Sequence, residues 1–127
     1  MLQNALRDRR VLVVEDEAML AMVYDEILTD AGAENVGPAA TVAEAKKLVV
    51  ANHISVALLD IRLGDEEVWP VARLLAAGGI PFLFCAGHFT ASTLPPEWAG
   101  RPVLTKPVRL TRVVAALAEL LAEAPET

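Results

Sequence analysis

Charged side chains follow three of the apolar runs in this 127-residue chain, at widely separated places in the sequence. Glu15 and Asp16 come directly after the first run, Asp60 ends another, and Lys106 follows a third. Carboxylates that converge repel one another, so a divalent cation or a cationic side chain is expected among them. Oxygen ligands without histidine or cysteine favour Mg²⁺ over zinc. An aspartate beside Mg²⁺ and a lysine can act as a nucleophile and form an acyl phosphate.

The same four residues also have a plainer interpretation. Three acids and a lysine can form an ordinary surface network, and the residue types alone leave the two interpretations about even. The choice between them depends on whether the fold brings these side chains together.

The hydrophobic pattern predicts strands that alternate with helices. Strands are predicted at residues 11–14, from Val36, at 54–59, at 80–85 and at 103–104, because short continuous apolar runs suit strands covered on both faces. A first helix is predicted from Met19 to Leu28, with a stop at Gly32, and a second after Thr41, with Ala45, Leu48 and Val49 buried. Two more are predicted from Trp69-Pro70 to Gly78-Gly79 and from Leu110 to Leu121. The segment 86–101 is the least regular, and Pro95-Pro96 excludes a long helix there.

This alternation predicts an α/β fold with a doubly wound, five-stranded parallel sheet and helices on both faces. Ligands of such sheets bind outside the carboxyl ends of the strands. Those ends are Glu15-Asp16, Asp60, Ala86 and Lys106, so three of the four predicted positions are charged. We therefore expect phosphoryl transfer onto a carboxylate at this edge.

Composition excludes several classes of function. Seventeen acidic and 11 basic residues give a net charge of −6, which argues against direct binding to nucleic acid or to an anionic membrane surface. Residues 74–96 lack charged side chains, but glycines and prolines interrupt them, so no membrane span is expected. A single cysteine, Cys85, indicates a reducing compartment, and we expect a cytoplasmic protein. The length predicts one domain, 1–127, with a core at about 8–123 and no output domain.

Three motifs in order resemble the receiver domain of two-component response regulators (CheY-like). They are Val13-Val14-Glu15-Asp16-Glu17 after the first strand, Leu58-Leu59-Asp60 ending the third, and Thr105-Lys106-Pro107 after the fifth. Each motif alone is weakly specific, but their order on the predicted elements is specific, and the resemblance covers about residues 8–123. It implies a flavodoxin-like sheet with strand order 2-1-3-4-5.

The resemblance also implies a role for each site residue. Asp60 matches the phosphorylated aspartate, and Lys106 matches the lysine that pairs with the phosphoryl group, with a cis bond to Pro107. Asp16 matches a direct Mg²⁺ ligand, Glu15 matches an acid that holds the metal through water, and Arg62 would contribute its backbone carbonyl. The implied partners are a histidine kinase or phosphotransfer protein and a downstream regulator.

Residues 80–88 are similar to the fourth strand of stand-alone receivers, which reads Pro-Phe-x-Phe-Ala-Thr-Gly followed by an aromatic residue. Two positions depart from the family pattern. Ala86 stands where a Thr or Ser hydroxyl normally bonds the phosphoryl group, unless a one-residue slip puts Cys85 there. Val103 stands where the family has its switch aromatic residue, and His88 lies near the missing hydroxyl. Losing one such donor can cost about 10²–10³ in rate, so slow phosphorylation is expected.

Three functions are compatible with these residues. The first is a single-domain response regulator that accepts a phosphoryl group on Asp60 and acts by protein–protein interaction or as a phosphorelay or phosphate sink, without being an enzyme in the ordinary sense. The second is a pseudo-receiver, an interaction module that works without phosphorylation, which Ala86 and Val103 favour. A Mg²⁺-dependent phosphohydrolase ranks last, because Arg62 stands where that class places an acid. The outer side of the terminal helix and the segment 86–101 are the candidate docking surfaces.

Overall fold

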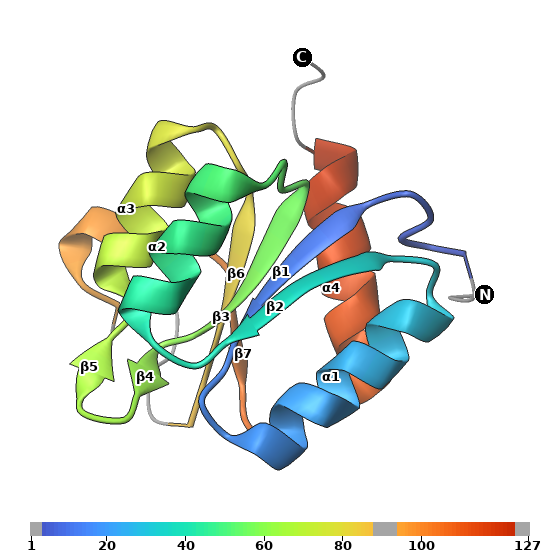
Figure 1. Cartoon of the computed structure of the whole chain (residues 1–127), viewed down its shortest axis with the longest axis horizontal. Helices are drawn as coiled ribbons and strands as arrows, with labels where there is room; N and C mark the ends of the chain where they lie inside the picture. Colours follow the sequence, from blue (N-terminus) through green and yellow to red (C-terminus); the bar gives the residue numbers. More distant parts are fainter. Residues whose placement is uncertain (1–3, 88–93, 124–127) are drawn as a thin grey trace.

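The computed structural model describes residues 4–87 and 94–123, which form three layers with a sheet in the middle (Figure 1). The sheet has five parallel strands: β1 (Arg10–Val14), β2 (Glu34–Ala39), β3 (Val56–Asp60), β6 (Phe82–Ala86) and β7 (Val103–Thr105). Their order across the sheet is β2-β1-β3-β6-β7, which corresponds to the expected order 2-1-3-4-5. The predicted α/β class and topology are therefore confirmed.

Two helices cover each face of the sheet (Figure 1). The helices are α1 (Ala18–Asp30), α2 (Val42–Ala51), α3 (Trp69–Ala77) and α4 (Leu110–Glu123). Smaller elements are a 3₁₀ helix, η2 (Pro96–Trp98), and an antiparallel hairpin of β4 (Arg62–Leu63) and β5 (Glu66–Glu67). Helices α1 and α4 pack on one face, and α2 and α3 pack on the other. The segment before β7 contains only this 3₁₀ turn among its described residues, as Pro95-Pro96 predicted.

The strands at the centre of the sheet are buried on both faces. All five residues of β3 and of β6 are buried, as the continuous apolar runs predicted. Successive side chains point to opposite faces, so Leu58 joins the core under α1 and α4 while Leu59 joins the core under α2 and α3. This double core holds the carboxyl ends of β1 and β3 side by side, with Val14 opposite Leu59.

Local capping fixes the helices near these strand ends. The Thr41 hydroxyl accepts a hydrogen bond from the backbone N–H of Glu44 at 3.1 Å, and the Glu44 carboxylate accepts one from Ala40 N at 3.3 Å. This arrangement matches the capping box expected there, except that the glutamate reaches the residue before the cap. Helix α3 starts at Trp69 with Pro70 in its first turn and ends before Gly78, as predicted.

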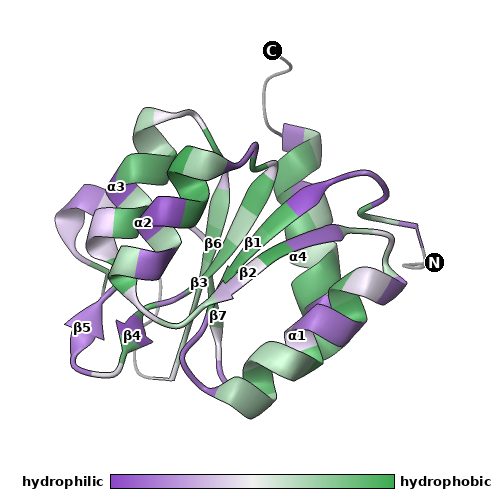
Figure 2. Ribbon diagram, viewed as in Figure 1, coloured by the Kyte–Doolittle hydropathy of each residue, from purple (hydrophilic) through white to green (hydrophobic). Residues whose placement is uncertain are grey.

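Helix α1 exposes much of its apolar surface. Its buried residues are Ala21, Tyr24 and Leu28, whereas Met19 is 77% exposed and Met22 is 70% exposed. In Figure 2 the first turns of α1 are green, whereas purple and green alternate along its later turns. A helix that lies on a sheet normally turns its large apolar residues inward. The outer surface of α1 near the carboxyl edge of the sheet therefore offers an apolar patch to a partner.

The acidic run Asp65-Glu66-Glu67 is not the solvated helix start that its composition suggests. Glu66 and Glu67 form β5, which pairs with β4, and α3 begins only at Trp69. Gly64 opens the turn with φ +65°, a conformation that glycine adopts without strain and that allows a tight hairpin here. Within residues 4–87 and 94–123, no helix combines the length and apolar character needed to cross a bilayer.

Candidate functional site

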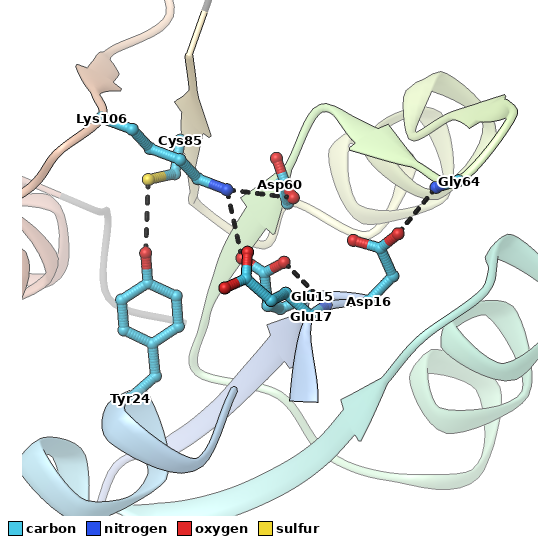
Figure 3. A network of polar contacts seen from close by, with 8 residues as sticks. All are labelled: Glu15, Asp16, Glu17, Tyr24, Asp60, Gly64, Cys85 and Lys106. Carbon is cyan, nitrogen blue, oxygen red and sulfur yellow. Dashed lines mark hydrogen bonds and ion pairs between the residues drawn. The ribbon is translucent and has the colours of Figure 1, made fainter. Parts of the chain in front are cut away.

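Three acidic side chains meet at the carboxyl edge of the sheet (Figure 3). Glu15 and Asp16 follow β1, and Asp60 is the last residue of the neighbouring strand β3. Each contributes a carboxylate oxygen to a group whose members all lie within 4.8 Å of one another. Glu15 and Asp60 are buried, and Asp16 is exposed. The convergence on which the phosphoryl-transfer interpretation depends is therefore present.

Lys106 reaches this cluster from the other side of β6. Its ammonium Nζ donates to Asp60 Oδ2 at 3.2 Å and to Glu15 Oε1 at 3.4 Å. The lysine backbone is anchored beside β6, because Lys106 N donates to the carbonyl of Ala86 at 2.8 Å. The Lys106–Pro107 bond is cis, as the resemblance implied. The ammonium thus lies where it can pair with Asp60 or with a group bound to it.

The charges of the cluster do not balance. Burial is the main cause that raises the pKa of Glu15 to about 7, and the neighbouring Asp60 carboxylate adds to it. The hydrogen bond from Glu17 N and the attraction of Lys106 lower this pKa, but by less. Partial burial opposes the charged form of Lys106, but Asp60 and Glu15 outweigh it and raise the lysine pKa above its usual value. One ammonium therefore faces three carboxylates, and the crowding disfavours full ionisation of Glu15. A cation in the cluster would remove this penalty.

The donor set fits Mg²⁺. All three side chains offer hard carboxylate oxygens, and none of the three is a histidine or cysteine. Octahedral Mg²⁺ holds its ligands at about 2.1 Å, so donors on opposite sides of the ion are about 4.2 Å apart. The oxygens of the group lie within 4.8 Å of one another, a slightly wider span than this. Glu15, Asp16 and Asp60 are therefore the residues that could hold the ion.

Arg62 lies two residues after Asp60 and begins β4. Its exposed guanidinium lies 3.8 Å from Glu67 Oε2, on the hairpin. Backbone pairing of Arg62 with Glu67 fixes the main chain at this point. The side chain thus takes part in the hairpin, and a metal contact through the backbone carbonyl stays a prediction.

The end of β6 carries no hydroxyl group. Ala86 is its last residue, buried opposite Thr105, while Cys85 is the residue paired with Asp60. The Cys85 thiol lies 3.5 Å from the hydroxyl of Tyr24, which α1 buries beneath the site. Burial raises the pKa of both groups, so both are neutral near pH 7. Cys85 is therefore directed to α1 and does not replace the missing hydroxyl.

Val103, at the switch position, is half-buried and packs against the core shared by α2 and α3. His88 lies outside the described residues. Trp98 is buried in that same core, 6.1 Å from Phe84 between ring centroids, which agrees with an anchoring role.

Sequence reasoning missed two contacts of the cluster. Tyr24 reads as one more apolar residue of α1, and nothing in its spacing indicates the contact with Cys85. Gly64 N donates to Asp16 Oδ2 at 2.8 Å from the turn of the β4–β5 hairpin. The Gly64-Asp65 pair is a signal for a two-residue turn, but two glutamates follow it, so the apolar alternation of a hairpin is missing on that side.

Solved structures resemble this one over nearly its whole length, although neither a family model nor a curated protein matches the chain. A response regulator receiver protein from Sinorhizobium medicae WSM419 is 27% identical, with a TM-score of 0.80 over 94% of this chain and 99% of that one. SdrG from Sphingomonas melonis Fr1 is 40% identical, with a TM-score of 0.75 over 92% of this chain and 98% of that one. The receiver domain of the response regulator PhyR from Erythrobacter litoralis is 23% identical, with a TM-score of 0.82 over 97% of both chains, and shows the fold alone.

Proposed function

Because the chain belongs to the receiver domains of response regulators, we propose that it accepts a phosphoryl group on Asp60 from a histidine kinase or a phosphotransfer protein. The observation that carries this proposal is the position of Asp60, which is buried at a strand end with the Lys106 ammonium 3.2 Å away and two further acids beside it. We propose that it works in the cytoplasm, by binding a partner or by draining phosphate from a relay.

The reaction is an in-line displacement at phosphorus. A carboxylate oxygen of Asp60 attacks the phosphoryl group of a phosphohistidine, the P–N bond breaks, and the imidazole leaves with the bond's electron pair and takes up a proton. Held by Glu15, Asp16 and Asp60, Mg²⁺ would supply positive charge to the phosphoryl oxygens. Lys106 supplies a second positive charge, and the neighbouring acids raise its pKa further above neutral pH. The neutral Cys85 and Tyr24 take no part in the transfer.

The alanine at the end of β6 predicts a slow reaction. A receiver with a hydroxyl at that place has one more donor for the phosphoryl oxygens, and the removal of such a donor costs about 10²–10³ in rate when the site is well organised. The parallel pairing of β6 with β7 directs the N–H of Ala86 to β7, which leaves the backbone N–H of Gly87 as the candidate donor at this strand end. We therefore expect measurable but weak phosphorylation by small donors.

A pseudo-receiver that works without phosphorylation is the second candidate, favoured by Ala86 and Val103. The buried acids count against it. Burying Glu15 costs folding free energy, since the charged form is desolvated and stands beside Asp60. A domain that never bound a cation or a phosphoryl group would gain stability by losing Glu15.

The surface beside the site suits a protein partner. A groove of about 850 Å³ runs from Glu15 and Asp16 along α1 and the end of β2, and Met22 lines it. Met19 is exposed on the same helix. A phosphodonor protein that reaches Asp60 would cover these methionines, which supports a docking surface on α1 in addition to those expected from sequence.

The decisive experiment is phosphorylation followed by intact-protein mass spectrometry. The protein is incubated with Mg²⁺ and acetyl phosphate or phosphoramidate, and with a phosphorylated histidine kinase from the same genome. The expected result is a Mg²⁺-dependent mass increase of about 80 Da that Asp60→Asn abolishes. Absence of the adduct with every donor would leave the pseudo-receiver, and an adduct that survives Asp60→Asn would place the acceptor elsewhere.

A further inference from the structure

Each acid of the cluster accepts at least one hydrogen bond. Glu15 accepts from Glu17 N at 3.1 Å, and Asp60 accepts from the Lys106 ammonium. Asp16, the exposed acid, accepts from the backbone N–H of Gly64 at 2.8 Å (Figure 3). This last contact is the shortest of the three, and it joins residues 48 positions apart. The donor lies in the turn of the β4–β5 hairpin.

The hairpin is held in place on its outer side. Glu66 Oε1 accepts from Val42 N at 3.3 Å, at the first residue of α2, where a carboxylate also interacts favourably with the helix dipole. At its base, Val68 N donates to the carbonyl of Ile61 at 2.9 Å. Contacts at the base and on β5 therefore fix the direction of the Gly64 amide in the turn between them.

We propose that the backbone N–H of Gly64 is a positioning group for Asp16 as a metal ligand. This inference rests on the proposed function, because it concerns the same cation site. A carboxylate has two oxygens, so the bond to Oδ2 leaves the other oxygen free for a cation. A hydrogen bond from an N–H group stabilises the ionised form of a carboxylate and restricts its rotation. An exposed aspartate without such a donor would lose rotational freedom only when the cation binds.

The β4–β5 hairpin contains one group assigned to the metal, the Arg62 carbonyl, and contacts another, the Asp16 carboxylate. Arg62, whose carbonyl is expected at the ion, begins β4, and Gly64 follows it by two residues. The arrangement thus connects the Asp16 carboxylate and the Arg62 main chain through one short turn. Groups that orient metal ligands in this way typically contribute 10–100-fold to metal affinity.

The test removes the N–H group without changing the turn. Gly64 has φ +65°, which is the φ that D-proline imposes and that D-alanine adopts readily. A β-carbon of L geometry at residue 64 meets no atom within 4 Å. In the D-proline variant the ring Cδ takes the place of the amide hydrogen, so the Asp16 carboxylate must turn away from residue 64. Chemical synthesis gives Gly64→D-Pro, which lacks the donor, and Gly64→D-Ala, which retains it. Titration calorimetry with Mg²⁺ and urea unfolding in EDTA are then compared for both proteins and the unmodified chain.

We expect Gly64→D-Pro to bind Mg²⁺ about 10-fold more weakly than Gly64→D-Ala. The two variants should be equally stable in EDTA, and acetyl phosphate should phosphorylate both to the same extent at saturating Mg²⁺. Equal Mg²⁺ affinity of the two variants would overturn the positioning role while leaving the proposed function intact. If the unmodified protein does not bind Mg²⁺, the inference and the metal site of the proposed function fail together.

A measurement on the unmodified backbone covers the case in which Gly64→D-Pro does not fold. NMR hydrogen exchange of the Gly64 amide is followed with and without Mg²⁺, in the unmodified protein and in Asp16→Ala. Positioning predicts that protection of this amide is lost in Asp16→Ala and persists when Mg²⁺ binds. Loss of protection upon Mg²⁺ addition would mean that the amide competes with the cation, and the inference would be wrong.

Discussion

Replacing Glu15 by glutamine should stabilise the metal-free protein, and only above about pH 5. The folded protein raises the pKa of Glu15 from 4.5 to about 7, chiefly by burial. Between these two values the folded state holds a proton that the unfolded state has released. The stability of the protein therefore falls as pH rises through this window, and it is constant above the folded pKa.

The size of the effect follows from the shift. A difference of about 2.5 pKa units corresponds to at most about 3.5 kcal/mol, at about 1.4 kcal/mol per unit. Glutamine cannot ionise, and its side-chain oxygen can still accept from Glu17 N. It also removes a negative partner of Lys106, which reduces the gain. We therefore expect Glu15→Gln to exceed the parent protein by about 1–3 kcal/mol at pH 8 and to match it near pH 4.5.

Urea unfolding in EDTA between pH 4.5 and 8.5 measures this difference directly, because the contributions of other groups cancel between the two proteins. Mg²⁺ should reverse the order at pH 8, since it stabilises only proteins that bind it. A difference that does not change with pH, or a parent protein that is the more stable at pH 8 in EDTA, would refute the charge imbalance inferred for the cluster.

Three further variants test the site, the α1 surface and the core. Ala86→Thr places a hydroxyl at the end of β6. Phosphorylation by acetyl phosphate, followed by mass spectrometry, should then accelerate about 10–100-fold. An unchanged rate would show that this position does not face the phosphoryl group. The double variant Met19→Gln, Met22→Gln should change the unfolding free energy by less than about 0.5 kcal/mol, since both residues are exposed. It should slow phosphoryl transfer from a kinase but not from acetyl phosphate. Phe84→Ala should lower the free energy of unfolding in urea by about 3–5 kcal/mol, because Phe84 is fully buried between Trp69 and Trp98. A loss below about 1 kcal/mol would contradict this packing.

The elements that position the site could be predicted from the sequence because their signals are local. The apolar runs of β3 and β6 are long enough to identify strands buried on both faces, and Gly78 and Pro70 mark the limits of α3. The alternation of strands and helices then requires the carboxyl ends to share one edge. For that reason the meeting of Asp60 with Lys106 and the acids after β1 was an expectation that the geometry could test.

The details that decide how the cluster behaves were not predictable in the same way. The exposure of Met19 depends on the rotation of α1 about its axis, which the packing of Tyr24 and Leu28 on the sheet determines. The charge state of Glu15 depends on its depth beside Asp60, which no residue type specifies. The contact from Gly64 to Asp16 requires a hairpin of only two residue pairs, which has almost no hydrophobic pattern. Such contacts follow from how separate elements pack, so the residues that tune the site lie outside the motifs that reveal it.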